Sequence, residues 1–447
     1  SGCDNGGPSP YTPALEAAGI AIDWSHRAAH VTDRPHPDRL AVTKALTSIA
    51  PDHPELVAAR GLRIPLQSWQ QVVADAAVGR RLVAVAGTHG KSTTAGWLTH
   101  VLVAAGRDPS AFVGALLPPS ITGGPPATAR RGGGGEFVVE ADEYAGNFDA
   151  YRPELVAVTN VDWDHPDVFA DLGAVLDGFV AWLARVPTAT VVVNVGDAGG
   201  AVLERRLRGR PGAVIPVTLG TRGEAPETDG IARALDWTPT AAGASVSIRL
   251  ADGRSLDARI RLAGVHNVAN ALVVAQVAAQ LGVPLAAIAA GLETFEGVGR
   301  RLERKGDAGG VTVYDDYGHH PTAIQATIQA VRQREPGRRL WVACEPLTYH
   351  RTAALLDLLA AALAEADGVA VADIWPGRDP DRTIASAAGL ADATRRAAPG
   401  KVVEAPGDVD ATADWLAAHV APGDVVLAMG GGRSYRIAER LLQMLAT

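Results

Sequence analysis

A glycine-rich segment carries the clearest chemical signal in the sequence. Residues 83–94 (VAVAGTHGKSTT) have the pattern of a strand, a glycine turn and the start of a helix. The glycines allow backbone N–H groups to approach phosphate oxygens, Lys91 adds a compact positive charge, and Ser92 can bind Mg²⁺. The segment therefore predicts a nucleotide-phosphate site made of Gly87, Thr88, His89, Gly90, Lys91, Ser92 and Thr93.

Two acidic clusters each follow a predicted strand. Residues 137–143 (FVVEADE) contain Glu140, and residues 158–167 (VTNVDWDHPD) contain His165. The carboxyl ends of parallel strands are where α/β proteins place their chemistry. Carboxylates there can bind Mg²⁺, and a neutral histidine can supply a nitrogen ligand. Acidic residues after a strand are mostly solvated, so it is the neighbouring phosphate loop that favours a functional site.

The pattern around these segments indicates an α/β fold. Apolar runs of strand length alternate with helical patterns, as in stacked β-α units with mainly parallel sheets. A helix is predicted from Pro321 until Pro336-Gly337, and an antiparallel hairpin is predicted over residues 244–262 around Asp252-Gly253. The clearest predicted strands are residues 82–86, 137–140, 155–159, 190–194, 311–315, 340–343, 369–372 and 425–428.

Length and composition exclude several classes of protein. The 447 residues suggest three domains at about 150 residues each. The net charge of -8 argues against nucleic-acid binding through bulk electrostatics. Only Cys3 and Cys344 are present, too few for a disulfide framework or a four-cysteine zinc site, which fits a cytoplasmic location. Residues 262–292 lack charge but contain polar residues and a Gly-Val-Pro break, so they predict two buried helices and no membrane span.

Six motifs occur in collinear order along nearly the whole chain. They are residues 87–91 (GTHGK), 140–143 (EADE), 159–165 (TNVDWDH), 266–270 (HNVAN), 299–301 (GRR) and 315–321 (DDYGHHP). Together they resemble the Mur ligase family, the ATP-dependent ligases of peptidoglycan synthesis and hence of cell-wall biogenesis, cell shape and division. The resemblance implies Rossmann-like, parallel-sheet N- and C-terminal domains around a central P-loop ATPase domain.

A polar turn near residue 79 and a glycine-rich hinge near residue 299 divide the predicted domains. Residues 1–79 would bind the UDP substrate, residues 80–299 would bind ATP, and residues 300–447 would bind the amino acid. Residues 1–4 (SGCD) resemble the end of the second strand of the UDP-binding domain. The resemblance therefore implies that a first strand and its glycine loop lie before residue 1.

The resemblance also implies roles for individual residues. Lys91, Glu140 and His165 would be catalytic, and Ser92, Glu140 and His165 would hold Mg²⁺. Asn267 and Asn270 would line the adenine pocket, while Arg301 and Asp316 would close over the phosphates and ribose. The expected substrate contacts are Thr47, Ser48, Tyr317, His319 and Arg351. Two other interpretations stay open: Asn267 and Asn270 as helix caps, and Arg300 and Arg301 as an exposed pair.

The motifs are most similar to those of the members that join L-alanine to UDP-N-acetylmuramate through an acyl phosphate. These two small molecules are the implied partners, with ATP and Mg²⁺ as cofactors, and the enzyme would be a monomer or weak homodimer. Residues 345–351 (EPLTYHR) keep only one of the basic positions typical of those members, and Glu345-Pro346 resembles members that add a whole peptide. A peptide-adding ligase and a nucleotide-binding homologue without ligase activity are therefore the alternatives.

Overall fold

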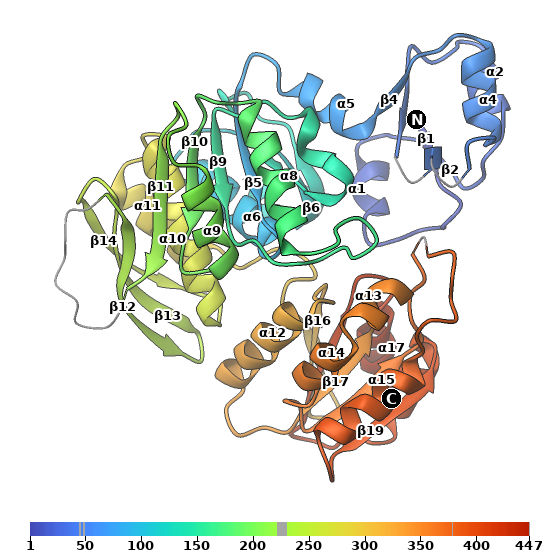
Figure 1. Ribbon diagram of the computed structural model, residues 1–447. Helices are drawn as coiled ribbons and strands as arrows, with labels where there is room; N and C mark the ends of the chain where they lie inside the picture. Colours follow the sequence, from blue (N-terminus) through green and yellow to red (C-terminus); the bar gives the residue numbers. More distant parts are fainter. Residues whose placement is uncertain (44–45, 48–49, 221–229, 378, 447) are drawn as a thin grey trace.

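The computed structural model describes residues 1–43, 46–47, 50–220, 230–377 and 379–446. Two large sheets dominate the fold, and Figure 1 shows the C-terminal sheet as a separate layer below the central one. Segments near the N-terminus, drawn in blue, lie beside the central sheet and above the C-terminal one in this view. The predicted α/β class is confirmed, and no helix in the described part of the chain is long and apolar enough to cross a membrane.

The central sheet has ten strands in the order β14-β13-β12-β11-β10-β9-β5-β8-β6-β7. All neighbours from β12 to β6 are parallel, whereas β12–β13, β13–β14 and β6–β7 are antiparallel. The predicted hairpin is confirmed as β13 and β14, which extend one edge of the sheet. The strands are β5 (Arg81–Ala86), β6 (Ser110–Leu117), β7 (Ala127–Arg130), β8 (Glu136–Glu140), β9 (Leu155–Val158), β10 (Thr190–Asn194), β11 (Val214–Leu219), β12 (Ala232–Thr240), β13 (Gly243–Arg249) and β14 (Ser255–Ile260).

Helices cover both faces of the central sheet because its middle strands are apolar on both sides. On one face pack α6 (Lys91–Ala104), α10 (Val265–Gln280) and α11 (Leu285–Thr294), and the last two confirm the predicted pair of buried helices. The other face packs against α8 (Leu172–Ala184), α9 (Ala198–Arg206) and the 3-10 helix η1 (Tyr144–Ala150). The short α7 (Pro119–Thr122) follows β6.

The C-terminal sheet has six strands in the order β15-β16-β20-β17-β18-β19, all parallel except the β15–β16 pair. The predicted helix begins at Pro321 and is α12, with the His320 side chain capping it by accepting from the Thr322 N–H. The strands are β15 (Glu303–Ala308), β16 (Val311–Asp316), β17 (Leu340–Glu345), β18 (Gly368–Ala372), β19 (Val402–Gly407) and β20 (Val425–Gly430). The helices are α12 (Pro321–Arg334), α13 (Tyr349–Ala354), α14 (Leu356–Leu363), α15 (Ala387–Ala397), α16 (Val409–Ala417) and α17 (Tyr435–Leu445).

The N-terminal segments form two small parallel pairs and have little apolar core. Strand β1 (Gly2–Cys3) pairs with β2 (Ile22–Asp23), and β3 (Leu40–Val42) pairs with β4 (Leu66–Ser68). In the described part of the chain before Ala77, the buried apolar side chains are Val31, Leu56 and Ala59. The helices are α1 (Thr12–Ala17), α2 (Ala29–Thr32), α4 (Pro54–Gly61) and α5 (Trp69–Ala76).

The predicted domain boundaries both fall between elements. Residue 79 lies between α5 and β5, and residue 299 lies between α11 and β15. The division into residues 1–79, 80–299 and 300–447 stays a prediction.

Candidate active site

Three adjacent central strands bring the sequence motifs together. Strand β5 lies between β8 and β9, and all three run parallel, so the loops that follow them meet at one edge of the sheet. These loops carry the phosphate motif, the acidic run after Glu140 and the segment containing His165. A cavity of about 860 Å³ lies there, and it is lined by residues from the central and C-terminal sheets.

Most of the predicted site residues line this cavity. From the central sheet these are Thr88, His89, Gly90, Lys91, Ser92, Thr93, Glu140, His165, Asn267 and Asn270. From the C-terminal sheet they are Arg301, Asp316, Tyr317 and His319. Gly87, Arg351 and Thr47 are not among the lining residues, and Ser48 lies outside the described residues.

The phosphate loop is held by the segment after β9. The backbone N–H of His89 donates to Asn160 Oδ1 at 2.8 Å, and the Asp162 N–H donates to Thr88 Oγ1 at 2.8 Å. Gly87 has a φ of 129° and packs so closely that a Cβ there would lie 2.2 Å from Thr159 Oγ1. Glycine is therefore required at this position by backbone conformation and by space.

Lys91 is paired with carboxylates from the neighbouring loop. Its Nζ lies 2.8 Å from Glu143 Oε2 and 3.4 Å from Asp142 Oδ1. Burial alone would lower the pKa of Lys91, but Glu143 and Asp142 outweigh that effect and raise it. Burial also raises the pKa of Glu143 to about 7, although Lys91 opposes this. The sequence motif contained Glu143, but no role was predicted for it, because only the fold shows that its carboxylate faces the lysine.

The C-terminal part of the chain reaches the phosphate loop through Arg301. Its Nη2 donates to Ser92 Oγ at 3.0 Å, and its guanidinium lies 4.8 Å from the centre of the Tyr317 ring. Asp316 accepts from the N–H groups of Leu302 and Gly318 at 2.7 and 2.6 Å, and burial raises its pKa. Arg301 therefore contacts the phosphate loop, while Asp316 holds the backbone that presents it.

Two alternative interpretations of the sequence are wrong. The α10 helix has no side-chain cap, and the Nδ2 of Asn267 instead donates to the Ala263 carbonyl at 2.7 Å. Asn270 packs against the phosphate loop, since a Cβ on Gly90 would lie 3.0 Å from its Oδ1. Arg300 is not exposed: it is buried, with Nε 3.1 Å from Asp315 Oδ2. Its guanidinium also donates to the Gly430 carbonyl and to Ser434 Oγ, and it interacts with Tyr11 from the N-terminal segments, so it supports the fold.

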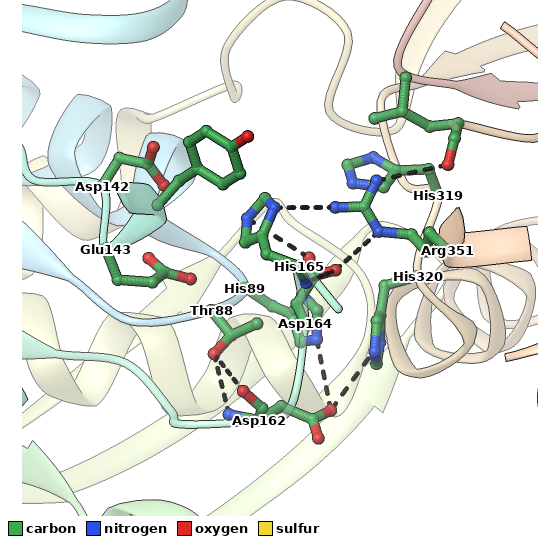
Figure 2. A network of polar contacts seen from close by, with 12 residues as sticks. Thr88, His89, Asp142, Glu143, Asp162, Asp164, His165, His319, His320 and Arg351 are labelled. Atoms are coloured by element: carbon green, nitrogen blue, oxygen red, sulfur yellow. Dashed lines mark hydrogen bonds and ion pairs between the residues drawn. The ribbon is translucent and has the colours of Figure 1, made fainter. Parts of the chain in front are cut away.

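A buried arginine joins the C-terminal sheet to the His165 segment. Figure 2 shows the Arg351 guanidinium between Asp164 and His165, with Nε donating to Asp164 Oδ1 at 2.6 Å and Nη2 donating to His165 Nδ1 at 3.1 Å. Burial acts to raise the pKa of Asp164, but Arg351 holds that pKa well below its usual range. Arg351 therefore bridges the two sheets, and its predicted contact with substrate stays a prediction.

The oxygen ligands at this edge fit Mg²⁺ better than His165 does. Asp142, Glu143 and His165 place one potential ligand atom each within 4.8 Å of one another, and Glu140 uses Oε2 to accept from the Gly114 N–H at 2.7 Å. Because Arg351 only donates, His165 Nδ1 is an acceptor, and the neutral ring then carries its proton on Nε2. His165 therefore has no free lone pair until Arg351 moves, whereas carboxylate and hydroxyl oxygens suit Mg²⁺ directly.

Two histidines flank Asp162 where the sheets meet. His89 Nε2 and His320 Nδ1 lie 3.4 and 3.8 Å from Asp162 Oδ2, and their ring centres are 4.6 Å apart (Figure 2). Thr322 Oγ1 donates to the same carboxylate oxygen at 2.8 Å. Burial, assisted by His89, lowers the pKa of His320 to about 4. His320 is therefore neutral at physiological pH. Protonation of its ring would add a positive charge beside the phosphate loop.

We expect His320→Asn to reduce the acid sensitivity of the protein. A histidine titrates near 6.5 in an unfolded chain but near 4 here, so the unfolded state binds the extra proton between these values. Stability is therefore highest above pH 6.5 and falls as the pH decreases towards 4. Asparagine keeps the helix cap but does not titrate. Between about pH 7.5 and about pH 5, the free energy of unfolding measured in urea should fall by about 2 kcal/mol less in the variant than in the wild type. The exposed His419→Asn variant is the control, and equal losses in wild type and His320→Asn would contradict the prediction.

Tyr317 and His319 lie on the wall of the cavity that the C-terminal sheet supplies. His319 Nδ1 donates to the Tyr317 carbonyl at 2.9 Å, which leaves Nε2 as an acceptor. Burial holds the pKa of His319 well below its usual range, so the ring is neutral. Their contact with substrate stays a prediction.

Comparison with known proteins assigns the family. Family models match three consecutive parts of the chain: "Mur ligase family, catalytic domain" over residues 1–81, "Mur ligase middle domain" over residues 85–278, and "Mur ligase, glutamate ligase domain" over residues 300–432. A UDP-N-acetylmuramate–L-alanine ligase of Frankia casuarinae is 37% identical, over 98% of this chain and 91% of the relative. The chain belongs to the Mur ligase family. Another such ligase, from Kineococcus radiotolerans, is 38% identical over 98% of this chain and 89% of its own length.

Solved structures of Mur ligases share the fold. The UDP-N-acetylmuramate–alanine ligase of Thermotoga maritima has a TM-score of 0.77 at 23% identity, covering 97% of this chain and 90% of its own. A murein peptide ligase of Psychrobacter arcticus has a TM-score of 0.72 at 23% identity, covering 100% and 93%. The MurF ligase of Thermotoga maritima, solved in complex with ADP, has a TM-score of 0.61 at 19% identity, covering 86% and 84%.

Proposed function

We propose that this protein is an ATP-dependent ligase that joins L-alanine to UDP-N-acetylmuramate in peptidoglycan synthesis. The observation that carries the proposal is the full-length relationship, at 37 and 38% identity, to ligases named for this reaction. The geometry agrees, because a phosphate loop, a carboxylate cluster and groups from a second sheet face one cavity. The solved structures of an alanine-adding ligase and of a murein peptide ligase both share the fold of this chain.

The phosphate-loop half of the cavity suits a nucleoside triphosphate. Lys91, the N-terminus of α6 and Arg301 supply positive charge to an otherwise acidic protein. The ADP complex of a family member with the same fold supports this use of the site. We assign Mg²⁺ to Ser92, Glu140 and the neighbouring carboxylates, and when bound it would neutralise charge on the phosphates. His165 would join this set only after releasing Arg351.

The reaction requires two anions to meet. The muramoyl carboxylate attacks the γ-phosphorus, ADP leaves, and the amino group of alanine then attacks the acyl carbon and expels phosphate. Lys91 must exchange Glu143 and Asp142 for phosphate oxygens, and Glu143 can take up a proton when it does, because its pKa is about 7. Arg301 and Tyr317 close the cavity from the second sheet, which positions the carboxylate and excludes water.

Phosphate release tests the proposal. With ATP, Mg²⁺, UDP-N-acetylmuramate and L-alanine, we expect phosphate at a rate that falls to background when either substrate is omitted. Mass spectrometry should detect UDP-N-acetylmuramoyl-L-alanine. Other amino acids and a tripeptide, tested with N-acetylmuramate-containing acceptors, provide the comparison. Turnover with the tripeptide and none with L-alanine would identify a peptide-adding ligase, and no turnover with any of them would identify a nucleotide-binding homologue.

A further inference from the structure

A cluster of metal-binding side chains lies far along the chain from the phosphate loop, in the N-terminal segments. Cys3 ends β1, His30 lies in α2, and Glu55 lies in the first turn of α4. Figure 1 shows these elements together at the N-terminal end of the molecule. The Cys3 thiol lies 3.1 and 3.2 Å from the two carboxylate oxygens of Glu55, and His30 Nδ1 lies 2.7 Å from Glu55 Oε1. One ligand atom from each of the three lies within 4.8 Å of the others.

Two more histidines complete the cluster. His26 Nδ1 lies 3.3 Å from Cys3 Sγ and 3.9 Å from Glu55 Oε1. His26, His53 and Glu55 form a second group whose ligand atoms lie within 4.8 Å of one another. Both ring nitrogens of His53 are buried and have no hydrogen-bond partner in the described part of the chain. Inaccessible ring nitrogens without a partner are costly unless they bind something.

The set of atoms is the one that zinc prefers. A thiolate, imidazole nitrogens and a carboxylate are all common zinc ligands, at about 2.0–2.3 Å from the metal. Tetrahedral bonds of that length place ligand atoms roughly 3.3–3.8 Å apart. The separations of 3.1, 3.3 and 3.9 Å around Cys3, His26 and Glu55 are close to this range, whereas His30 Nδ1 and Glu55 Oε1, 2.7 Å apart, would have to separate.

The surroundings provide the second layer that metal-bound histidines have. Asp23 Oδ2 lies 3.1 Å from His30 Nε2, but Arg27 Nε donates to the same nitrogen at 2.9 Å, so Asp23 can accept a proton there, with Nδ1 on a metal, only after Arg27 moves away. Arg27 Nη2 lies 2.5 Å from the same Asp23 oxygen and keeps that carboxylate charged. The Cys3 thiol donates to Glu55 Oε1 at 3.1 Å, and a metal ion would take the place of that proton.

The position of the cluster explains what a metal would add. A metal bound here would link β1, α2 and α4, which are separate along the chain. We propose that Cys3, His30 and Glu55, with a fourth ligand from the His26 and His53 pair, bind a structural Zn²⁺ ion that joins β1, α2 and α4.

Cobalt substitution tests the proposal on the full chain. After chelation and dialysis, we titrate Co²⁺ and record the thiolate-to-cobalt charge-transfer absorption. We expect one equivalent of Co²⁺ to produce this absorption, Zn²⁺ to displace it, and Zn²⁺ to raise the thermal midpoint. Cys3→Ser should remove the absorption and weaken Zn²⁺ binding by at least ~100-fold, and Asp23→Asn should weaken it by roughly 10-fold.

The chain contains its own matched control. Cys344, the other cysteine, is buried in β17, so Cys344→Ser should keep the absorption. Comparing His26→Gln with His53→Gln then identifies the fourth ligand. The group formed by His89, Asp162 and His320 contains no sulfur and cannot produce the thiolate signal. Absence of the signal in the wild-type protein, or its persistence in Cys3→Ser, overturns the proposal, and the wild-type spectrum does so without any variant needing to fold.

Discussion

Lys91→Ala is expected to lower ATP-dependent product formation by about 10²–10³-fold, the cost of removing one charge-stabilising donor from a phosphoryl-transfer site. The lysine is the cation that the phosphate loop itself places beside the carboxylates of the next loop. Without it, Glu143 and Asp142 would repel the incoming phosphates. Phosphate release and ADP formation, measured with saturating L-alanine and acceptor, check this outcome.

The fold should survive this change. A buried carboxylate that loses its cation is normally costly, but the pKa of Glu143 is already about 7, so this group can become neutral by binding a proton. Far-UV circular dichroism should therefore match that of the wild type. Lys305→Ala is the matched control, because Lys305 pairs with Glu303 outside the cavity. Ligase rates for Lys91→Ala close to those of Lys305→Ala would disprove the role of the lysine.

Arg351→Ala is expected to lower the free energy of unfolding by about 3–5 kcal/mol, the usual cost of leaving one partner of a buried ion pair uncompensated. Arg351 and Asp164 are both buried, and Nε lies 2.6 Å from Oδ1. The same guanidinium orients His165 and joins α13 to the loop after β9. Ligase activity should therefore fall together with stability. Arg351→Lys should not fully restore the activity, because lysine lacks the planar guanidinium whose N–H groups reach both partners.

An exposed pair of the same chemistry provides the comparison. Arg436 and Asp410 lie 2.8 Å apart, but their side chains are 41% and 40% exposed. Arg436→Ala should therefore cost no more than about 1 kcal/mol in urea unfolding. Because Arg351 depresses the pKa of Asp164, the pair contributes stability above the usual aspartate pKa and loses it as the pH falls below that value. The difference between wild type and Arg351→Ala should therefore shrink in acid, and a difference independent of pH would contradict the pairing.

The comparison between prediction and structure is clearest for strands. Buried strands such as Arg81–Ala86, after its first residue, and Val425–Gly430 are continuous apolar runs, so the sequence predicted them. Strand β15, Glu303–Ala308, contains Glu, Arg, Lys and Asp and was not predicted. It forms because it pairs with β16 at the edge of the C-terminal sheet, where polar side chains face solvent. Strand formation there depends on the partner more than on local propensity.

The candidate site divides in the same way. The phosphate loop is local, since its glycines, lysine and serine are consecutive and their geometry follows from a strand-to-helix turn. The partners of those residues are not local. Lys91 and Glu143 are 52 positions apart, and Arg301 and Ser92 are 209 apart. No periodicity in the sequence indicates such contacts.

Two arginines have protein partners that the sequence did not indicate. Arg351 donates to Asp164 and His165, while its contact with substrate stays a prediction, and Arg300, interpreted as half of an exposed pair, is buried against Asp315. In both cases the residue type was compatible with several partners, because a guanidinium can bind any nearby oxygen. The strand order decides which oxygen is near.

The sequence by itself therefore determined the α/β class, the phosphate loop and the resemblance to a ligase family, because each depends on residues that are close along the chain. Tertiary structure alone decided which carboxylate pairs with Lys91, that His165 shares a buried arginine, and that Cys3 meets histidines and Glu55 from two other segments. The physical reason is that ion pairs and ligand sets depend on separations of a few ångströms. In this protein, parallel strands and their crossover helices set those separations across tens to hundreds of residues.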